Sequence, residues 1–139
     1  MFYECTYRVC YGDTDRMGVV YYGNYYTFFE RGRTEMLRSA GLPYARLEEL
    51  GNFLPVAESH CRYLSPARYD DLLTFRSAVL EVSRVRIKVG TQVRRDDELL
   101  ASGYVILASV GRDGRIARLH PELEAACRRF ALAEGEEWK

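Results

Sequence analysis

The sequence has few of the residues that most metal and hydrolase sites use. It contains two histidines, His60 and His120, which lie far apart in the chain. His60 falls in a predicted strand and His120 at a predicted helix start. No G-x-S-x-G, G-x-G-x-x-G, Walker A or H-E-x-x-H pattern occurs. A Ser-His-Asp hydrolase and a His-liganded metalloenzyme are therefore disfavoured, and we expect no metal site.

Long apolar runs and paired cysteines are also missing. No apolar run approaches the roughly 20 residues that a helix needs to cross a bilayer, so we expect no membrane insertion. The first residues lack the pattern of a signal peptide. The four cysteines form no C-x-x-C pair; they are Cys5, Cys10, Cys61 and Cys127. The cysteine spacing and the missing signal-peptide pattern together predict a reduced, cytoplasmic protein.

Neither sign of charge is in excess, because 20 Lys and Arg residues balance 20 Asp and Glu residues. A basic surface for nucleic acid or for an anionic membrane is therefore not indicated, and we expect no nucleic-acid partner. Almost all of the basic residues are arginines, which suit phosphate recognition as well as surface ion pairs.

Hydrophobic and aromatic residues are plentiful, at 47% and 13% of the 139 residues. This composition is typical of a folded chain, and no low-complexity tract or internal repeat interrupts it. We therefore predict a single domain that spans residues 1–139.

Alternation of apolar and polar residues predicts a first strand over residues 3–11. A long amphipathic helix should follow, beginning between Val20 and Asn24 and ending at Gly41, just before Pro43. Its apolar stripe includes Gly32, and a glycine inside a helix lowers the stability of the helix by up to about 1 kcal/mol relative to alanine. Close approach of the helix to a flat sheet would explain a glycine there.

Four further segments have the character of strands: residues 53–64, 71–82, 84–95 and 98–110. Their connections are short, which favours antiparallel neighbours over helical crossovers. The last of them is apolar on both faces and should lie inside the sheet. A short terminal helix should begin at His120–Pro121. The order predicts an α+β fold in which the long helix lies across an antiparallel sheet.

The stretch "YGDTDRMGVVYYGNYYTFFERGRTEM", residues 11–36, carries the most chemistry. Asp13 and Asp15 precede the long helix, and the unpaired N–H groups of a helix start can stabilise an oxyanion. A carboxylate beside them could attack an acyl carbon or activate water against it. The same acids could instead serve only turn formation and helix capping. The pocket walls would come from Val19, Val20, Tyr21, Tyr22, Tyr25 and Tyr26.

This stretch resembles the signature of the 4-hydroxybenzoyl-CoA thioesterase family, D-x-D-x-x-G-x-V-x-x-x-x-Y. The segment "YLSPARYDDLL" is similar to the family's second motif, Y-x-x-P-A-x-x-x-D-x-L, so the resemblance covers nearly the whole chain. It implies a hotdog fold, in which an antiparallel sheet wraps a long helix. It also implies hydrolysis of acyl-CoA thioesters, with no cofactor apart from the coenzyme A (CoA) carried by the substrate.

Carried onto this sequence, the resemblance makes Asp15 the catalytic nucleophile or general base, and Asp13 is expected to be a hydrogen-bond acceptor that shapes the loop. The amides near Tyr22 and Gly23 would polarise the thioester carbonyl, and Gly18 would let the loop turn beside the substrate. Many members of the Tol-Pal-associated bacterial branch have histidine in place of Tyr22, so aromatic and short aliphatic acyl groups both stay open. The expected pocket residues are Val20, Tyr21 and Tyr25, and the candidate cations for the CoA phosphates are Arg62, Arg68, Arg84 and Arg86.

The family also implies assembly, because its active sites lie at subunit boundaries. We therefore expect a homo-oligomer, with a tetramer favoured over a dimer. A hotdog dehydratase is disfavoured because those enzymes use a catalytic histidine paired with an acid. The alternative from another class is a non-catalytic acyl-CoA sensor or scaffold of the same fold.

Overall fold

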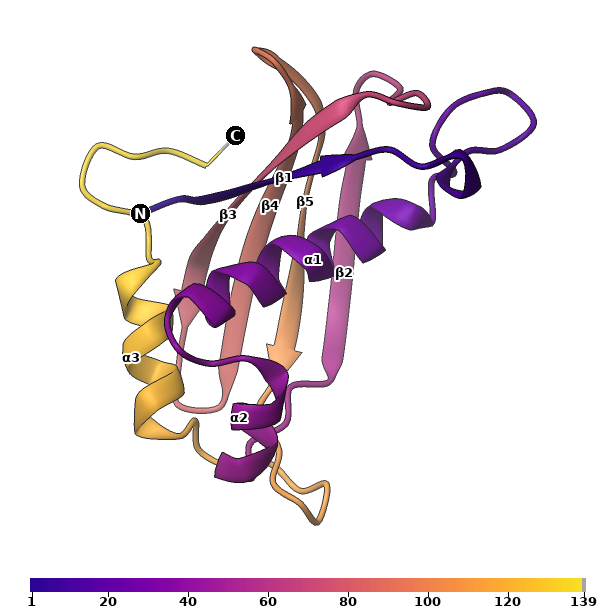
Figure 1. Cartoon of the computed structure of the whole chain (residues 1–139). Coiled ribbons are helices and arrows are strands. Elements are labelled where there is room, and N and C mark those ends of the chain that lie inside the picture. The colour runs from indigo at the N-terminus through magenta and orange to yellow at the C-terminus, as the bar shows by residue number, and fades with distance from the viewer. Residues whose placement is uncertain (139) are drawn as a thin grey trace.

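A computed structural model describes residues 1–138 and contains one five-stranded antiparallel sheet (Figure 1). The strand order is β1-β3-β4-β5-β2. The strands are β1 (Tyr3–Arg8), β2 (Val56–Tyr63), β3 (Leu72–Val82), β4 (Arg86–Arg95) and β5 (Glu98–Ala108). The predicted α+β arrangement and all five predicted strands are confirmed, although β1 ends earlier than the sequence pattern indicated.

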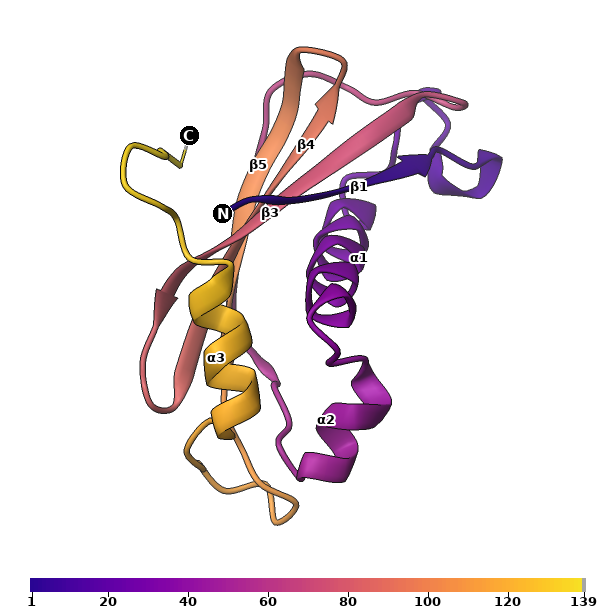
Figure 2. The same cartoon turned by 60° about the vertical axis from the view of Figure 1, so that its left-hand side comes forward.

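The long helix α1 (Asn24–Ser39) lies across one face of this sheet, as Figures 1 and 2 show. Its start agrees with the predicted range. Gly32 lies where α1 approaches the sheet closely, because a Cβ added there would be 2.6 Å from the Oγ of Ser77. A side chain at this position would collide with the sheet, which confirms the explanation given for the glycine.

The buried core falls into two clusters, one near each end of α1. Around the N-terminal half of α1, aromatic rings dominate, and the rings of Phe28 and Phe75 stack with centroids 5.1 Å apart. Around the C-terminal half, Met36 and Leu37 pack against aliphatic side chains of the sheet and against the last helix, α3 (Pro121–Arg129). Gly32 lies between the two clusters in the chain.

Three features differ from the sequence-based expectation. The hairpins β3–β4 and β4–β5 are present, but β2 pairs with β5 and not with its sequence neighbour β3. A second helix, α2 (Tyr44–Leu50), follows α1 and was not predicted. Tyr11 lies in a short 3-10 turn and is exposed, so it does not continue β1.

Strand β2 forms one edge of the sheet (Figure 1). Its side chains are exposed on both faces. Of its side chains only Cys61 is partly buried. An open strand edge of this kind offers unpaired backbone groups to another chain. Within residues 1–138, no helix is both long enough and apolar enough to cross a membrane.

Candidate active site

The loop between β1 and α1 folds back on itself and docks on the β2–β3 connection. The amide of Asp15 donates to the carbonyl of Val19 at 2.9 Å, and the amide of Val20 donates to the carbonyl of Ala67 at 2.8 Å. Gly18 has a φ of 78°, a value that favours glycine, and this permits the tight turn. The role expected for Gly18 in shaping the loop agrees with this geometry.

Asp13 holds the beginning of the loop. Its Oδ2 accepts hydrogen bonds from the Cys10 amide at 2.8 Å and from the Tyr7 hydroxyl at 2.6 Å. Its carbonyl accepts from the Tyr21 amide at 2.9 Å. Asp13 is therefore a hydrogen-bond acceptor that shapes the loop, as predicted, and its carboxylate is already occupied.

Asp15 has a different environment. Its carboxylate accepts one hydrogen bond, from the Met17 amide to Oδ1 at 2.8 Å, and forms no ion pair within residues 1–138. The side chain borders two neighbouring grooves. A half-buried carboxylate with free lone pairs between two open grooves can act on a bound molecule.

The first of these, the Asp15 groove, has a volume of about 320 Å³. Its lining consists of Asp15, Met17, Val19, Val20, Tyr22, Tyr25, Tyr63, Leu64, Ser65 and Pro66. The second, the Tyr11 groove, has a volume of about 530 Å³ and is lined by Tyr11, Thr14, Asp15, Arg16, Gly18 and Tyr69. The first is mainly apolar and aromatic, and the second also contains the cationic Arg16.

The start of α1 supplies hydrogen-bond donors beside the Asp15 groove. Among the contacts of residues 1–138, the backbone N–H groups of Tyr22 and Gly23 donate no hydrogen bond, and Gly23 caps the helix. Unpaired amides at a helix N-terminus carry partial positive charge and stabilise a developing oxyanion. The two amides proposed from the sequence are therefore available for this role.

Three tyrosines form the aromatic wall of the Asp15 groove. The hydroxyl of Tyr63 donates to the carbonyl of Tyr22 at 3.1 Å, and the rings of Tyr25 and Tyr63 meet edge to face. Burial raises the pKa of both Tyr25 and Tyr63 above the ordinary tyrosine value of about 10, so both phenols are hydrogen-bond donors and not bases near pH 7. Val20 and Tyr25 line this groove as expected, whereas Tyr21 lies outside the linings of both grooves.

The four candidate arginines are not brought together in one chain. The backbone of Arg68 forms an isolated β-bridge with Val19 beside the loop. Arg62 lies on β2 next to Tyr63, but on the opposite face of the strand. Arg84 and Arg86 lie at the other end of the sheet, where Arg86 pairs with Ala108. Of the four arginines expected to bind the CoA phosphates, Arg62 and Arg68 therefore remain as candidates within a single chain.

The sequence did not reveal a polar network that holds the β2–β3 connection. Arg95 at the end of β4 donates to the carboxylate of Asp71 at 2.7 Å and to the carbonyl of Pro66 at 3.3 Å. Burial alone would raise the pKa of Asp71, but hydrogen bonds from the Arg68 amide and the Arg95 guanidinium outweigh it and lower this pKa. Asp71 belongs to the segment "YDDLL" of the second family motif, which was the one feature of the sequence that could have indicated this network.

Metal ligands do not gather at this site. Within residues 1–138, no group of three or more His, Cys, Asp or Glu side chains is placed to hold a metal ion. The expectation that the reaction needs no cofactor stays a prediction.

Comparison with known proteins places this geometry in a family. The model of the thioesterase superfamily matches residues 17–102, more than half of the chain. An acyl-CoA thioesterase of Haemophilus influenzae, YbgC, is 38% identical over 104 residues, which cover 74% of this chain and 76% of the relative.

Solved structures agree in fold. TT1821 from Thermus thermophilus has a TM-score of 0.88 and 32% identity, covering 96% of this chain and 100% of that chain. A DHNA-CoA thioesterase from Staphylococcus aureus has a TM-score of 0.86 and 27% identity, covering 92% and 89% respectively. The hotdog fold and the enzyme class predicted from the sequence, a thioester hydrolase, are confirmed. This chain belongs to the thioesterase superfamily.

Proposed function

We propose that this chain hydrolyses acyl-CoA thioesters to the free acid and coenzyme A. One observation carries the proposal. Asp15 and Tyr22 border the same apolar groove, and the unpaired amide of Gly23 follows that of Tyr22 directly in the chain. A base or nucleophile and an oxyanion site on opposite sides of one acyl carbon are the two groups that thioester hydrolysis requires.

The reaction proceeds by one of two routes with the same residues. As a general base, Asp15 takes a proton from water as the water oxygen attacks the acyl carbon; the C–S bond then breaks, and the CoA thiolate leaves with the proton that Asp15 returns. As a nucleophile, its oxygen attacks directly, the CoA thiolate leaves, and water then cleaves the mixed anhydride. In both routes the carbonyl oxygen becomes negatively charged and accepts hydrogen bonds from the Tyr22 and Gly23 amides.

We assign each end of the substrate to one of the two grooves. The acyl group lies in the Asp15 groove, whose tyrosine wall and volume of about 320 Å³ suit an aromatic or short aliphatic acyl chain. The CoA phosphates lie toward the Tyr11 groove, where Arg16 borders the groove and Arg68 lies beside the adjacent loop. Coenzyme A is part of the substrate, and we propose no separate cofactor.

We further propose a homo-oligomer in the cytoplasm, with a dimer as the minimal active unit and a tetramer as the full assembly. The exposed edge of β2 and the exposed tyrosines beside it, Tyr22 and Tyr63, support an added copy of the chain. The four free cysteines suit a reducing compartment. Light scattering at assay concentration measures the assembly, and a fully active monomer would contradict it.

The deciding experiment separates hydrolysis from binding alone. Release of free CoA is followed with a thiol reagent for a panel of aromatic, short-chain and long-chain acyl-CoAs. Calorimetry measures binding of the same compounds in parallel. We expect repeated turnover with the aromatic or short-chain members. Tight binding of acyl-CoA without release of CoA above the protein-free rate would replace the proposed enzyme with a sensor or scaffold.

A further inference from the structure

A side-chain hydrogen bond connects the edge strand β2 to the start of α1. The hydroxyl of Tyr63, the last residue of β2, lies 3.1 Å from the backbone carbonyl oxygen of Tyr22. Because a carbonyl can only accept a hydrogen bond, the hydroxyl is the donor. The ring of Tyr63 belongs to the wall of the Asp15 groove, but the two reaction routes leave its hydroxyl without a role.

Two neighbouring rings hold Tyr63 in this position. Its ring meets that of Tyr25 edge to face with centroids 5.2 Å apart, and meets that of Tyr22 edge to face with centroids 6.3 Å apart. Edge-to-face contacts between aromatic rings have a preferred geometry. The ring cannot turn away from the helix start without losing both contacts, so the hydroxyl stays on the Tyr22 carbonyl.

This carbonyl belongs to the peptide group that carries the Gly23 amide. The carbonyl of Tyr22 and the N–H of Gly23 are the two ends of one planar trans peptide group and point in opposite directions. The carbonyl also accepts from the Tyr25 amide, over a long 3.3 Å. A second donor on the carbonyl fixes the peptide plane and therefore the direction of the Gly23 N–H. Linked hydrogen bonds also polarise one another, which makes this N–H a stronger donor.

We propose that Tyr63 is a positioning residue whose hydroxyl orients and polarises the Tyr22–Gly23 peptide group for oxyanion stabilisation. The inference rests on the proposed function and adds a residue that acts through the backbone without touching the reacting atoms. No proton leaves Tyr63 during the reaction. The negative charge on the acyl oxygen develops in the transition state, so the hydroxyl should act on kcat and leave KM nearly unchanged.

Tyr63→Phe tests this role because it keeps the ring and removes only the hydroxyl. Tyr63 is 47% exposed, so the variant should fold, as circular dichroism can verify. On a good acyl-CoA substrate we expect kcat to fall about five- to twentyfold, with KM within about twofold of the wild type.

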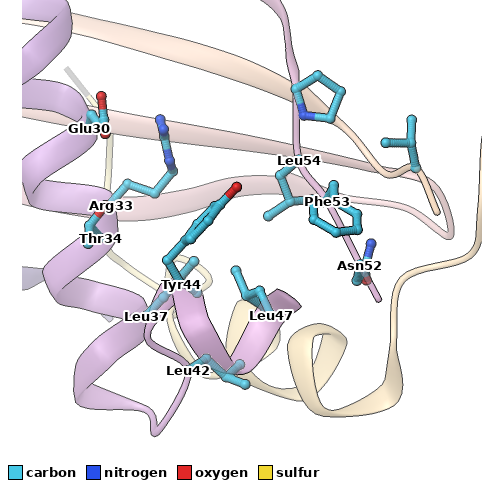
Figure 3. A pocket seen from close by; sticks show the side chains of 12 residues that line it. Glu30, Arg33, Thr34, Leu37, Leu42, Tyr44, Leu47, Asn52, Phe53 and Leu54 are labelled. Carbon is cyan, nitrogen blue, oxygen red and sulfur yellow. The ribbon is translucent and has the colours of Figure 1, made fainter. Parts of the chain in front are cut away.

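Tyr104→Phe is the matched control, since it makes the same chemical change elsewhere on the sheet. The ring of Tyr104 contacts Lys88 and His60, and the residue lines neither groove beside Asp15. Neither tyrosine lines the separate pocket between α1, α2 and the segment that leads into β2 (Figure 3). Tyr104→Phe should leave both kcat and KM unchanged.

A measurement without substrate observes the peptide group itself. The chain contains two Tyr–Gly pairs, Tyr11–Gly12 and Tyr22–Gly23. Labelling tyrosine carbonyls with ¹³C and glycines with ¹⁵N therefore selects two coupled amide resonances in an NMR spectrum. Loss of a hydrogen bond on a carbonyl moves the ¹⁵N resonance of the next residue upfield. Tyr63→Phe should move the Gly23 resonance upfield and leave that of Gly12 in place.

The two measurements separate failure of this inference from failure of the proposed function. An unmoved Gly23 resonance in folded Tyr63→Phe would overturn the inference whatever the chain hydrolyses. Normal kcat despite a moved resonance would reduce the hydrogen bond to a structural contact, and a raised KM with normal kcat would mean that the hydroxyl contacts the bound substrate; both results overturn the inference alone. If the wild type releases no CoA, the proposed function fails and the catalytic role of Tyr63 fails with it.

Discussion

The start of α1 and its C-terminal half serve the molecule in different ways. At the N-terminal end, the helix start has unpaired amides, the tyrosines beside it are exposed, and Asp15 borders open grooves. At the C-terminal end, Met36 and Leu37 are buried among aliphatic side chains of the sheet and of α3. Because Phe28 and Phe29 of the N-terminal half are buried as well, the helix is anchored in the core along both halves and presents reactive groups only at its start. Hydrogen-bonding groups are left without a partner at the place where a bound ligand can pair with them.

The largest expected effect compares the stability contributed by a buried residue of α1 with that of an exposed residue just before the helix start. Met36 is 1% exposed and Tyr22 is 63% exposed. Met36→Ala should lower the free energy of unfolding by about 2–5 kcal/mol because it leaves a cavity. Tyr22→Ala should change it by at most about 0.5 kcal/mol. Urea unfolding measures both, and equal losses would contradict the contrast between the buried helix and its exposed start.

A smaller effect concerns the β2–β3 connection, which supports the Asp15 groove. Because Arg95 lowers the pKa of Asp71, the ionised pair stabilises the fold above the ordinary aspartate pKa and loses this contribution as pH falls through the lowered value. Arg95→Met should cost about 1 kcal/mol at neutral pH, and this difference from wild type should shrink below about pH 4.

The control for Arg95 is Arg38→Met, which breaks an exposed pair with Glu35 and should cost less than about 0.5 kcal/mol. Urea unfolding across the acid range gives the comparison. A cost of Arg95→Met that does not change with pH would show that the Asp71 charge is not what the arginine stabilises.

The smallest effect concerns binding of CoA at the reactive end of α1. Arg68 lies beside the Asp15 loop and Arg84 at the opposite end of the sheet. Arg68→Ala should weaken CoA about three- to fivefold, less at high salt because screening shortens electrostatic reach to about 8 Å at physiological ionic strength. Arg84→Ala should have no effect in calorimetry. The reverse result would move the nucleotide to the far end of the sheet.

Local patterns predicted the parts of this fold that local chemistry determines. The position of α1, the close contact at Gly32 and the role of Asp13 all depend on neighbouring residues or on a single packing constraint. The helix α2 escaped prediction because its seven residues, "YARLEEL", are too few to show a clear helical period.

Other features depend on contacts between distant segments. Pairing of β2 with β5 cannot be predicted from connection length, because strand order is a property of the whole sheet. For the same reason, the three-dimensional structure was needed to reveal the contact between Arg95 and Asp71. It was also needed to show that Arg84 and Arg86 lie far from Asp15.

The most direct test of the account compares Asp15→Asn with Asp13→Asn on one good acyl-CoA substrate. Asparagine preserves shape and hydrogen bonding, so both variants should fold, as circular dichroism can verify. Asp15→Asn removes the base or nucleophile and should lower turnover by about 10²–10⁴-fold while substrate binding persists. Asp13→Asn weakens only a loop contact and should lower turnover by at most about tenfold. Near-normal turnover by folded Asp15→Asn would contradict the account.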